Sequence, residues 1–214
     1  MNEPTDQLSG FSKVFHGDDA AKAPYDQVLL ETDRFVVVPS KGSLFSNWLL
    51  LIPKKPLLNF VQYHAEFEEP TSELEYVARK FGRTEWIWFE HGPASSGSAV
   101  GCGVDYAHLH LLLDPPFRLE QMTAEVEAMS KTTWSRRGAS EVYQALGNHS
   151  DYYAFGTKVE AYTASGESLG SQFFRKAIAA VVGKPCEWNY RTHVGLEHAL
   201  ETLGNLVPSL TKAA

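Results

Sequence analysis

The stretch Asp105-Tyr-Ala-His-Leu-His-Leu-Leu-Leu113 decides the fold that this sequence predicts. Side chains alternate between the two faces of a β-strand, so a strand here places Tyr106, His108 and His110 on one face. The opposite face is apolar and suits a core; it carries Ala107, Leu109, Leu111 and Leu113. A Gly/Ser-rich segment, residues 95–103, leads directly into the strand. The pattern predicts a half-buried strand with two neighbouring imidazoles at the end of a glycine loop.

Two histidines side by side on a strand allow several interpretations. They can be structural side chains held by hydrogen bonds, and the spacing alone favours this as much as any function. They can also supply two metal ligands from one face, and the nearest third ligands in sequence are then His91, Glu90 or Cys102. The spacing does not choose between structure, metal binding and catalysis, so the rest of the chain has to.

The composition limits the classes of protein. With 214 residues, 43% of them hydrophobic, the chain can build one substantial core. A formal net charge of -7 argues against a broad basic surface for long nucleic acids but allows small anionic ligands. Two cysteines without paired spacing support neither a disulfide framework nor a zinc ribbon. The start lacks an apolar secretory segment and no run of 18 apolar residues occurs, so we expect a soluble cytoplasmic protein without membrane spans.

Periodicity and turn signals divide the rest of the chain into strands and helices. Strands are predicted over 27–31 and 34–38 as a hairpin, over 48–52, over 84–91, and over 152–155 and 159–163 as a second hairpin. Helices are predicted over 70–82, 119–131, 171–182 and 193–206. Residues 1–24 are polar, although Phe11, Val14 and Phe15 could dock on a core.

The central stretch resembles the motif of the histidine-triad superfamily of nucleotide hydrolases and transferases. In that motif three histidines alternate with apolar residues after a glycine-containing phosphate loop, and here tyrosine takes the place of the first histidine. The upstream segments 31–39 and 48–55 are similar to the family's strands that end in Pro-Lys. Four short segments resemble a bacterial branch of the superfamily: 89–92, 101–105, 171–175 and 188–191.

The resemblance implies an α+β fold, with a mostly antiparallel sheet of about five strands and flanking helices. It divides the chain into an N-terminal segment over 1–24, a catalytic core over 25–131 and a C-terminal extension over 132–214 packed on the core. The ligand that it implies is a small nucleotide or dinucleotide. It also implies a homodimer, and it requires no metal or other cofactor.

The resemblance gives roles to individual residues. The family's middle histidine attacks the α-phosphorus of a nucleotide and forms a nucleotidyl-histidine intermediate, a role that falls on His108. His110 and Tyr106 then assist the reaction. Backbone N–H groups of the glycine loop would receive phosphate oxygens, as glycine-rich turns commonly do. This loop comprises Gly101, Cys102, Gly103 and Val104.

Four further residues are candidates for substrate contacts. Gln172 and Arg175 lie three positions apart in a predicted helix, so they share a face and could reach an anion. Glu90 could bind ribose hydroxyls, and its neighbour His91 could compensate for a missing family histidine. An ordinary polar helix face and turn caps are the structural alternatives for these residues.

Two positions depart from the family pattern. Tyr106 replaces the first histidine, and Pro56 stands where the family often has a histidine that orients the nucleophile. Tyrosine can donate a hydrogen bond, but it does not become cationic near neutral pH. A second hypothesis is therefore a regulatory protein that binds nucleotides without turnover, and a third is the metal-dependent enzyme. His64 or His91 could take over the orienting role in space.

Overall fold

The computed structural model describes residues 10–16, 22–67, 69–101, 104–147, 150–165 and 169–212. Within them, eight strands form one sheet in the order β1-β2-β3-β5-β4-β7-β8-β6. All seven neighbouring pairs are antiparallel. The strands are β1 (Leu30–Glu31), β2 (Phe35–Pro39), β3 (Trp48–Pro53), β4 (Trp86–Gly92), β5 (Leu109–Leu113), β6 (Ser135–Gly138), β7 (Tyr152–Gly156) and β8 (Glu160–Ser165).

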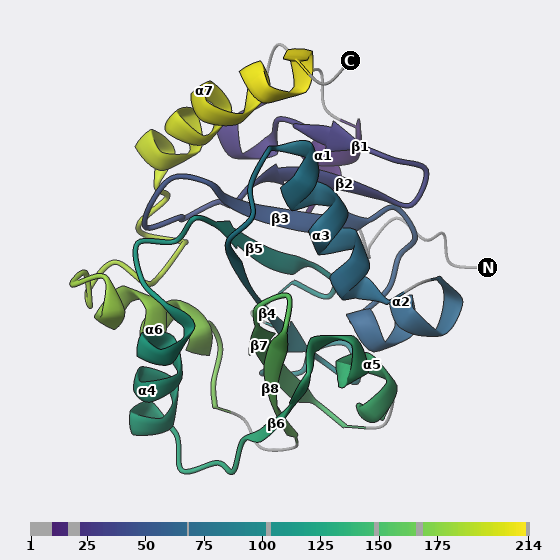
Figure 1. The fold of residues 1–214 in the computed structure, drawn as a ribbon, viewed down its shortest axis with the longest axis vertical. Helices are drawn as coiled ribbons and strands as arrows, with labels where there is room; N and C mark the ends of the chain where they lie inside the picture. The colour runs from purple at the N-terminus through teal and green to yellow at the C-terminus, as the bar shows by residue number, and fades with distance from the viewer. Residues whose placement is uncertain are drawn as a thin grey trace.

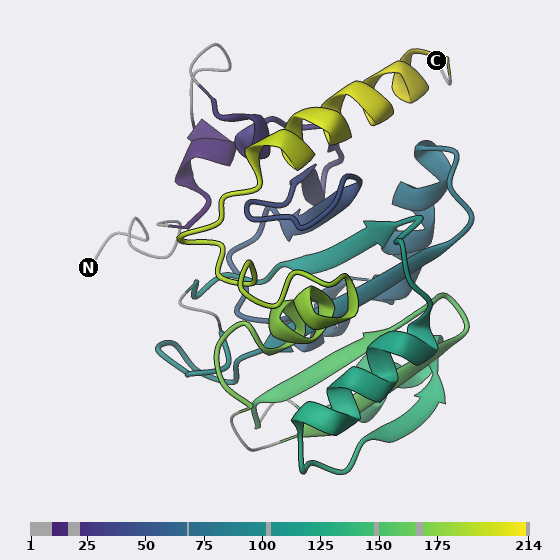
Figure 2. The same cartoon turned by 90° about the vertical axis from the view of Figure 1, so that its left-hand side faces the viewer.

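Helices cover both faces of the sheet. They are α1 (Ser12–His16), α2 (Phe60–Glu66), α3 (Pro70–Lys80), α4 (Leu119–Met129), α5 (Val142–Ala145), α6 (Phe173–Val181) and α7 (Leu196–Lys212). One core packs α2, α3 and α5 against the sheet, and a second packs α4 and α6 on the opposite face (Figure 1). Figure 2 shows α4 and α6 together over that second face. The fold is α+β, as predicted.

The strand β5 begins at Leu109, so Tyr106 and His108 of the predicted strand precede it, whereas within β5 the predicted alternation holds. Leu109, Leu111 and Leu113 belong to the core beneath α2 and α3. Leu112 belongs to the core beneath α4 and α6, and His110 shares its face. The period-two pattern therefore places the histidines on the side of the sheet that α6 covers.

The sheet is larger than the predicted five strands. The hairpin of β7 and β8 occurs where it is predicted, and it extends the sheet beyond β4. The sequence pattern gives no indication of β6, because its residues Ser-Arg-Arg-Gly do not alternate between apolar and polar side chains. The segment after residue 131 thus continues the sheet, because it supplies three of the eight strands.

The two ends of the described chain meet the β1–β2 side of the sheet. Val14 of α1 packs with Val36, Val38 and Leu50, which confirms that this segment docks on a core. The last helix begins at Leu196, three residues later than predicted, and continues to Lys212. Figure 1 shows this helix, in yellow, lying beside β1 and β2.

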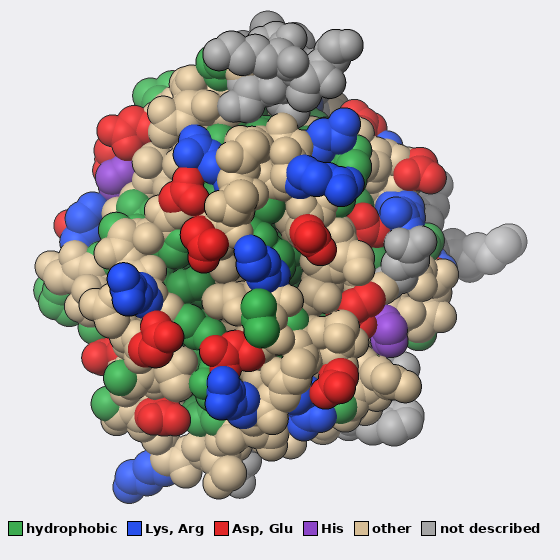
Figure 3. Space-filling view, in the orientation of Figure 1, with side chains coloured by type: hydrophobic (Ala, Val, Ile, Leu, Met, Phe, Trp, Pro, Cys, Tyr) green, Lys and Arg blue, Asp and Glu red, His purple; other side chains and the backbone are tan. Residues whose placement is uncertain are grey.

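The surface carries charges of both signs. On the face shown in Figure 3, basic and acidic side chains are interspersed, and neither sign forms one continuous patch. Among the described residues, no helix combines the length and apolar character needed to cross a membrane.

Candidate functional site

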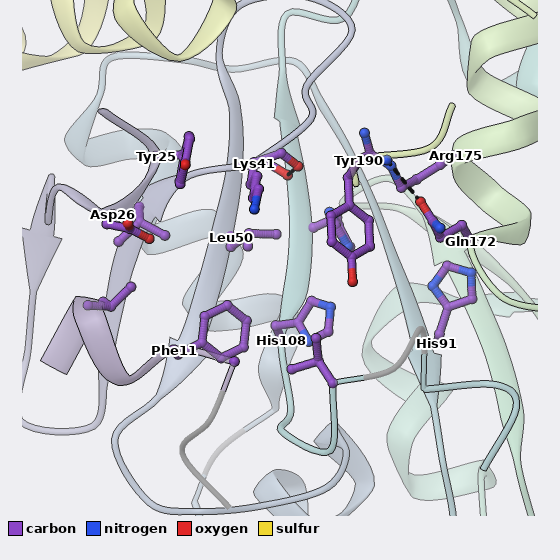
Figure 4. A pocket seen from close by; sticks show the side chains of 16 residues that line it. Phe11, Tyr25, Asp26, Lys41, Leu50, His91, His108, Gln172, Arg175 and Tyr190 are labelled. Carbon is purple, nitrogen blue, oxygen red and sulfur yellow. Dashed lines mark hydrogen bonds between the residues drawn. The ribbon is translucent and has the colours of Figure 1, made fainter. Parts of the chain in front are cut away.

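A cavity lies on the face of the sheet that carries the histidines, between α1, the strands β2, β3 and β5, and α6. His91, His108, His110, Gln172, Arg175 and Tyr190 line one part of it. Phe11, Val14, Tyr25, Asp26, Val38, Lys41 and Leu50 line the other. Figure 4 shows His108 in the middle, Tyr25 and Asp26 to the left, and His91, Gln172 and Arg175 to the right.

The hydrogen bond of His108 fixes its tautomer. Its Nδ1 lies 2.8 Å from the backbone oxygen of Tyr106, and a carbonyl oxygen can only accept, so Nδ1 carries the proton. Nε2 therefore keeps its lone pair. The ring is partly exposed to the cavity, but surrounding protein atoms desolvate it and lower the pKa of His108 below its ordinary 6.5. The neutral imidazole needed for nucleophilic attack is thus the stable form near pH 7.

His110 has the opposite tautomer. The indole N–H of Trp48 donates to His110 Nδ1 over 3.0 Å, so the neutral ring carries its proton on Nε2. The ring stacks on Phe89, with 4.1 Å between ring centroids and 12° between planes. Burial, together with the positive charge of Arg175 and the neighbouring histidines, lowers the pKa of His110 well below 6.5. His110 is therefore held as a neutral N–H donor beside His108.

Tyr106 acts through its backbone rather than its hydroxyl. The hydroxyl donates to the carbonyl oxygens of Pro53 at 2.9 Å and Lys54 at 3.2 Å, and burial raises the pKa of Tyr106 to about 12. The side chain packs beneath α1 and does not line the cavity. The hydroxyl is therefore engaged with backbone oxygens and is not offered to a phosphate, which was one way in which Tyr106 could assist. Its carbonyl group instead orients His108.

Arg175 and Gln172 reach the cavity from the C-terminal part of the chain, as predicted. Arg175 Nε donates to the carbonyl oxygen of Trp188 at 3.0 Å, and its guanidinium lies 4.9 Å from the Trp48 ring centroid. Gln172 precedes α6 as its N-cap, with φ 60°, instead of lying in the helix. Its side-chain oxygen accepts the backbone N–H of Tyr190 at 3.2 Å. The residues that follow α6 therefore form part of the cavity wall.

Gly42 permits this C-terminal wall to approach the loop between β2 and β3. Its carbonyl oxygen accepts a hydrogen bond from Arg175. Its φ is +74°, and a Cβ atom here would lie 2.4 Å from Cβ of Tyr190. Only glycine combines this conformation with so close a contact.

His91 brings a third imidazole to the cavity. Its Nε2 lies 3.5 Å from the backbone N–H of Phe174, at the start of α6, and its Nδ1 is buried without a hydrogen-bond partner among the described residues. Burial, with the repulsion of His108 and Arg175, lowers the pKa of His91 to about 3. Two histidines were candidates to replace the family's orienting histidine. His91 lies at the cavity, whereas His64 of α2 lies outside it, with its Nδ1 3.4 Å from a carboxylate oxygen of Glu69.

Glu90 points away from the cavity, which corrects its predicted ribose contact. It accepts the backbone N–H of Phe60 at 2.7 Å and the hydroxyl of Tyr152 at 2.8 Å on the opposite face. Burial raises the pKa of Glu90 to about 7. Neighbouring residues of a strand face opposite sides, so Glu90 and His91 could not both reach one ligand.

The described part of the glycine loop also differs from the prediction. The Gly101 N–H donates to Ser98 at 3.2 Å, and the Val104 N–H donates to the carbonyl of Gly101 at 3.0 Å. These two amides close turns and are not offered to a phosphate, although the Val104 side chain lines the cavity. Cys102 and Gly103 lie outside the described residues.

The metal hypothesis gains no third ligand from the described chain. Glu90 faces away, and within these residues no group of three or more His, Cys, Asp or Glu side chains could hold a metal ion. Of the other two candidates, His91 lines the cavity with His108 and His110 without forming such a group, and Cys102 lies outside the described residues.

Sequence reasoning missed several residues of the cavity. Trp48 does not line the cavity itself, but its indole N–H fixes His110; the apolar run 48–52 predicts a strand and gives no sign of this role. Its strand β3 lies next to β5, and this pairing is not visible in either segment alone. Asp26, Lys41 and Tyr190 lie outside the strands, and no local pattern distinguishes Asp26 and Lys41 from surface residues, whereas Tyr190 belongs to the segment 188–191 that resembles the family's bacterial branch.

A scan against protein-family models and a search of curated proteins each gave no match. A search of solved structures found the crystal structure of yeast Ap4A phosphorylase Apa2 in complex with AMP, with 13% sequence identity and a TM-score of 0.44. The match covers 74% of this chain and 64% of that enzyme's chain, which is less than two thirds of its length.

Proposed function

We propose that the cavity binds a nucleotide and that His108 Nε2 attacks its α-phosphorus, which makes the protein a nucleotide phosphohydrolase or nucleotidyltransferase. The observation that carries this proposal is the pair of opposite tautomers in one cavity, with a lone pair on His108 Nε2 and a proton on His110 Nε2. One ring can form a bond to phosphorus while the other donates to a phosphate oxygen. The resemblance to the histidine-triad motif supports the same assignment.

The reaction proceeds in two displacements. His108 Nε2 uses its lone pair to form a bond to the α-phosphorus, while the bond from phosphorus to the leaving-group oxygen breaks and its electron pair departs with that oxygen. The imidazole keeps its Nδ1 proton and becomes cationic, and the carbonyl group of Tyr106 stabilises this charge. Water or another acceptor then attacks phosphorus and gives its proton to solvent, and the Nε2–phosphorus electrons return to His108.

Three side chains of the cavity can stabilise the negative charge of a phosphate. The Arg175 guanidinium is held in the cavity wall by the carbonyl oxygens of Trp188 and Gly42. His110 offers Nε2–H, and the unpartnered Nδ1 of His91 offers a second imidazole contact. Fixed donors of this kind stabilise a transition state without reorganising during the reaction. This donor set takes the place of the amides of Gly101 and Val104, which close turns.

A second candidate is a nucleotide-binding protein without turnover. Two observations favour it: the hydroxyl of Tyr106 is engaged with backbone oxygens, and Pro56 is exposed at the exit of β3. It predicts binding of the same ligands with no covalent intermediate.

Homodimerisation and a cytoplasmic location, both expected from the sequence, stay predictions.

The test is an incubation with α-labelled nucleotides and dinucleoside polyphosphates in the presence of a chelator, quenched for intact-protein mass and peptide mapping. We expect a nucleotidyl adduct on wild type that maps to His108, is absent from His108→Ala and persists in His64→Ala, the control histidine outside the cavity. An adduct that persists in His108→Ala would overturn the proposal. Binding without any adduct or product would establish the second candidate instead.

A further inference from the structure

A row of three side chains forms the floor of the cavity beside the reactive histidine. Val38 pairs with Leu50, and Leu50 pairs with His110, so these residues lie in line across β2, β3 and β5. Neighbouring strands are about 4.8 Å apart, which places Val38 about 10 Å from His110. The floor is therefore apolar from Leu50 outward, and it extends away from the phosphate end.

The helix α1 lies over this floor. Phe11 and Val14 line the same cavity, and the Phe11 ring centroid lies 5.5 Å from that of His108. An apolar lining with an aromatic ring on one side and aliphatic side chains on the other suits a planar heterocycle, because stacking and burial then act on both of its faces. A nucleotide held through its α-phosphorus at His108 places its ribose over Leu50 and its base over Val38.

An acidic and a basic side chain, Asp26 and Lys41, lie at the far end of this space. Asp26, in the 3-10 helix η3 (Pro24–Asp26), is half-buried, and no described residue forms a hydrogen bond or ion pair with its carboxylate. Burial raises the pKa of Asp26. The positive charges of Lys13, Lys41 and Lys22 partly oppose this shift, because they stabilise the ionised carboxylate. The Lys41 ammonium lies 5.3 Å from the ring centroid of Tyr25. Both Asp26 and Lys41 line the cavity, and Figure 4 shows Asp26 on the side of the pocket opposite His91.

We propose that Asp26 and Lys41 read the base edge and select guanine nucleotides. A carboxylate accepts two parallel N–H groups, and guanine presents N1–H and the N2 amine side by side. The adjacent O6 of guanine accepts from an ammonium group such as that of Lys41. Adenine presents a lone pair at N1, which a carboxylate oxygen repels. This inference rests on the proposed function, because His108 sets the position of the phosphate.

The test is equilibrium binding of four nucleoside monophosphates to wild type and Asp26→Asn by calorimetry. Wild type should bind GMP roughly 10- to 100-fold more tightly than AMP, the range of a good bidentate contact to a base. IMP, which lacks the N2 amine, should fall between them. In Asp26→Asn the new amide N–H₂ faces the base, so GMP should weaken and XMP, which has a carbonyl at that position, should strengthen.

The control is Asp33→Asn, which makes the same chemical change at an exposed position outside this cavity. It should keep the wild-type order of affinities. Equal affinities for all four nucleotides, or an order unchanged by Asp26→Asn, would overturn the guanine proposal.

Different outcomes contradict the proposed covalent step and the proposed base selection. Adducts on His108 formed equally from guanine and adenine nucleotides would uphold the proposed function and overturn the base selection. Guanine-selective binding that Asp26→Asn removes, without any adduct, would uphold the base selection and overturn the covalent step. Absence of binding for every nucleotide would overturn both.

Discussion

The two faces of the sheet at β4 bury titratable side chains in different ways. Glu90 faces α2 and has partners inside the protein, the N–H of Phe60 and the hydroxyl of Tyr152. Its neighbour His91 faces the cavity, and its Nδ1 has no partner among the described residues. Burial raises the pKa of Glu90 to about 7 and lowers that of His91 to about 3, so each is driven toward its neutral form. Burial is therefore common to both residues, and what separates them is the nitrogen of His91 that has no partner among the described residues.

The largest expected effect is on the cavity face. His108→Ala should lower turnover by at least about 10³-fold, because it removes the proposed nucleophile. The melting temperature should stay close to that of wild type, because the side chain is partly exposed and its hydrogen bond is to one backbone carbonyl oxygen. Steady-state kinetics and thermal melts check both parts. Turnover within tenfold of wild type would contradict the assignment of His108.

Glu90→Ala should lower the stability of the protein and leave its turnover unchanged, the reverse of His108→Ala. It leaves the Phe60 N–H and the Tyr152 hydroxyl without their buried acceptor, which costs about 2–5 kcal/mol of unfolding free energy. Denaturant unfolding measures this loss, and turnover per folded molecule should be retained. Glu90→Gln, which keeps one carbonyl oxygen, is the matched control and should lose less. A selective loss of turnover in a stable Glu90→Ala protein would return Glu90 to the site.

Trp48→Phe tests whether His110 acts through its tautomer. The substitution removes the N–H that donates to His110 Nδ1 but keeps an aromatic ring, and we expect a roughly 10- to 100-fold lower kcat/KM with a changed pH profile. Trp88→Phe is the control on the other face, because the indole N–H of Trp88 donates to the carbonyl of Thr157 at 3.1 Å. Equal effects of the two substitutions on kcat/KM would show that Trp48 is merely structural.

The smallest expected effect is the pH dependence of stability. Between pH 4.5 and 7 the folded state holds a proton on Glu90 that the unfolded state releases, so the Glu90 contribution to stability grows as the pH falls. The lowered pKa values of His91 and His110 act in the opposite direction, because the unfolded state gains protons below pH 6.5. Glu90→Gln should therefore lose stability more steeply than wild type on acidification, by roughly 1 kcal/mol per pH unit. Parallel stability curves would contradict the burial assigned to Glu90.

The sequence predicts the parts of the fold that depend on local periodicity. The alternation through β5 and the hairpin of β7 and β8 are visible because each pattern lies within one short segment. The same alternation, applied to β4, places Glu90 and His91 on opposite faces of the sheet. Their adjacency in the sequence suggested, wrongly, that both contact one ligand.

The parts that were missed depend on pairing between distant segments. Trp48 reaches His110 because β3 lies next to β5, and Tyr190 reaches the cavity because Gln172 accepts its N–H. Nothing local marks Asp26 as a cavity residue either. The two histidines of the central motif were therefore predictable as neighbours in one site, whereas the groups that orient them and complete the cavity were not.

The most direct measurement identifies which ring nitrogen carries phosphorus in the trapped intermediate. Protein labelled with ¹⁵N in its histidines would be quenched during turnover and examined by ³¹P and ¹⁵N NMR together with peptide mapping. The opposite tautomers predict a phosphorus–nitrogen bond at Nε2 of His108, with Nδ1 protonated and His110 unmodified. A bond at Nδ1, a bond at His110 or His91, or turnover with no phosphorus–nitrogen bond would contradict the account.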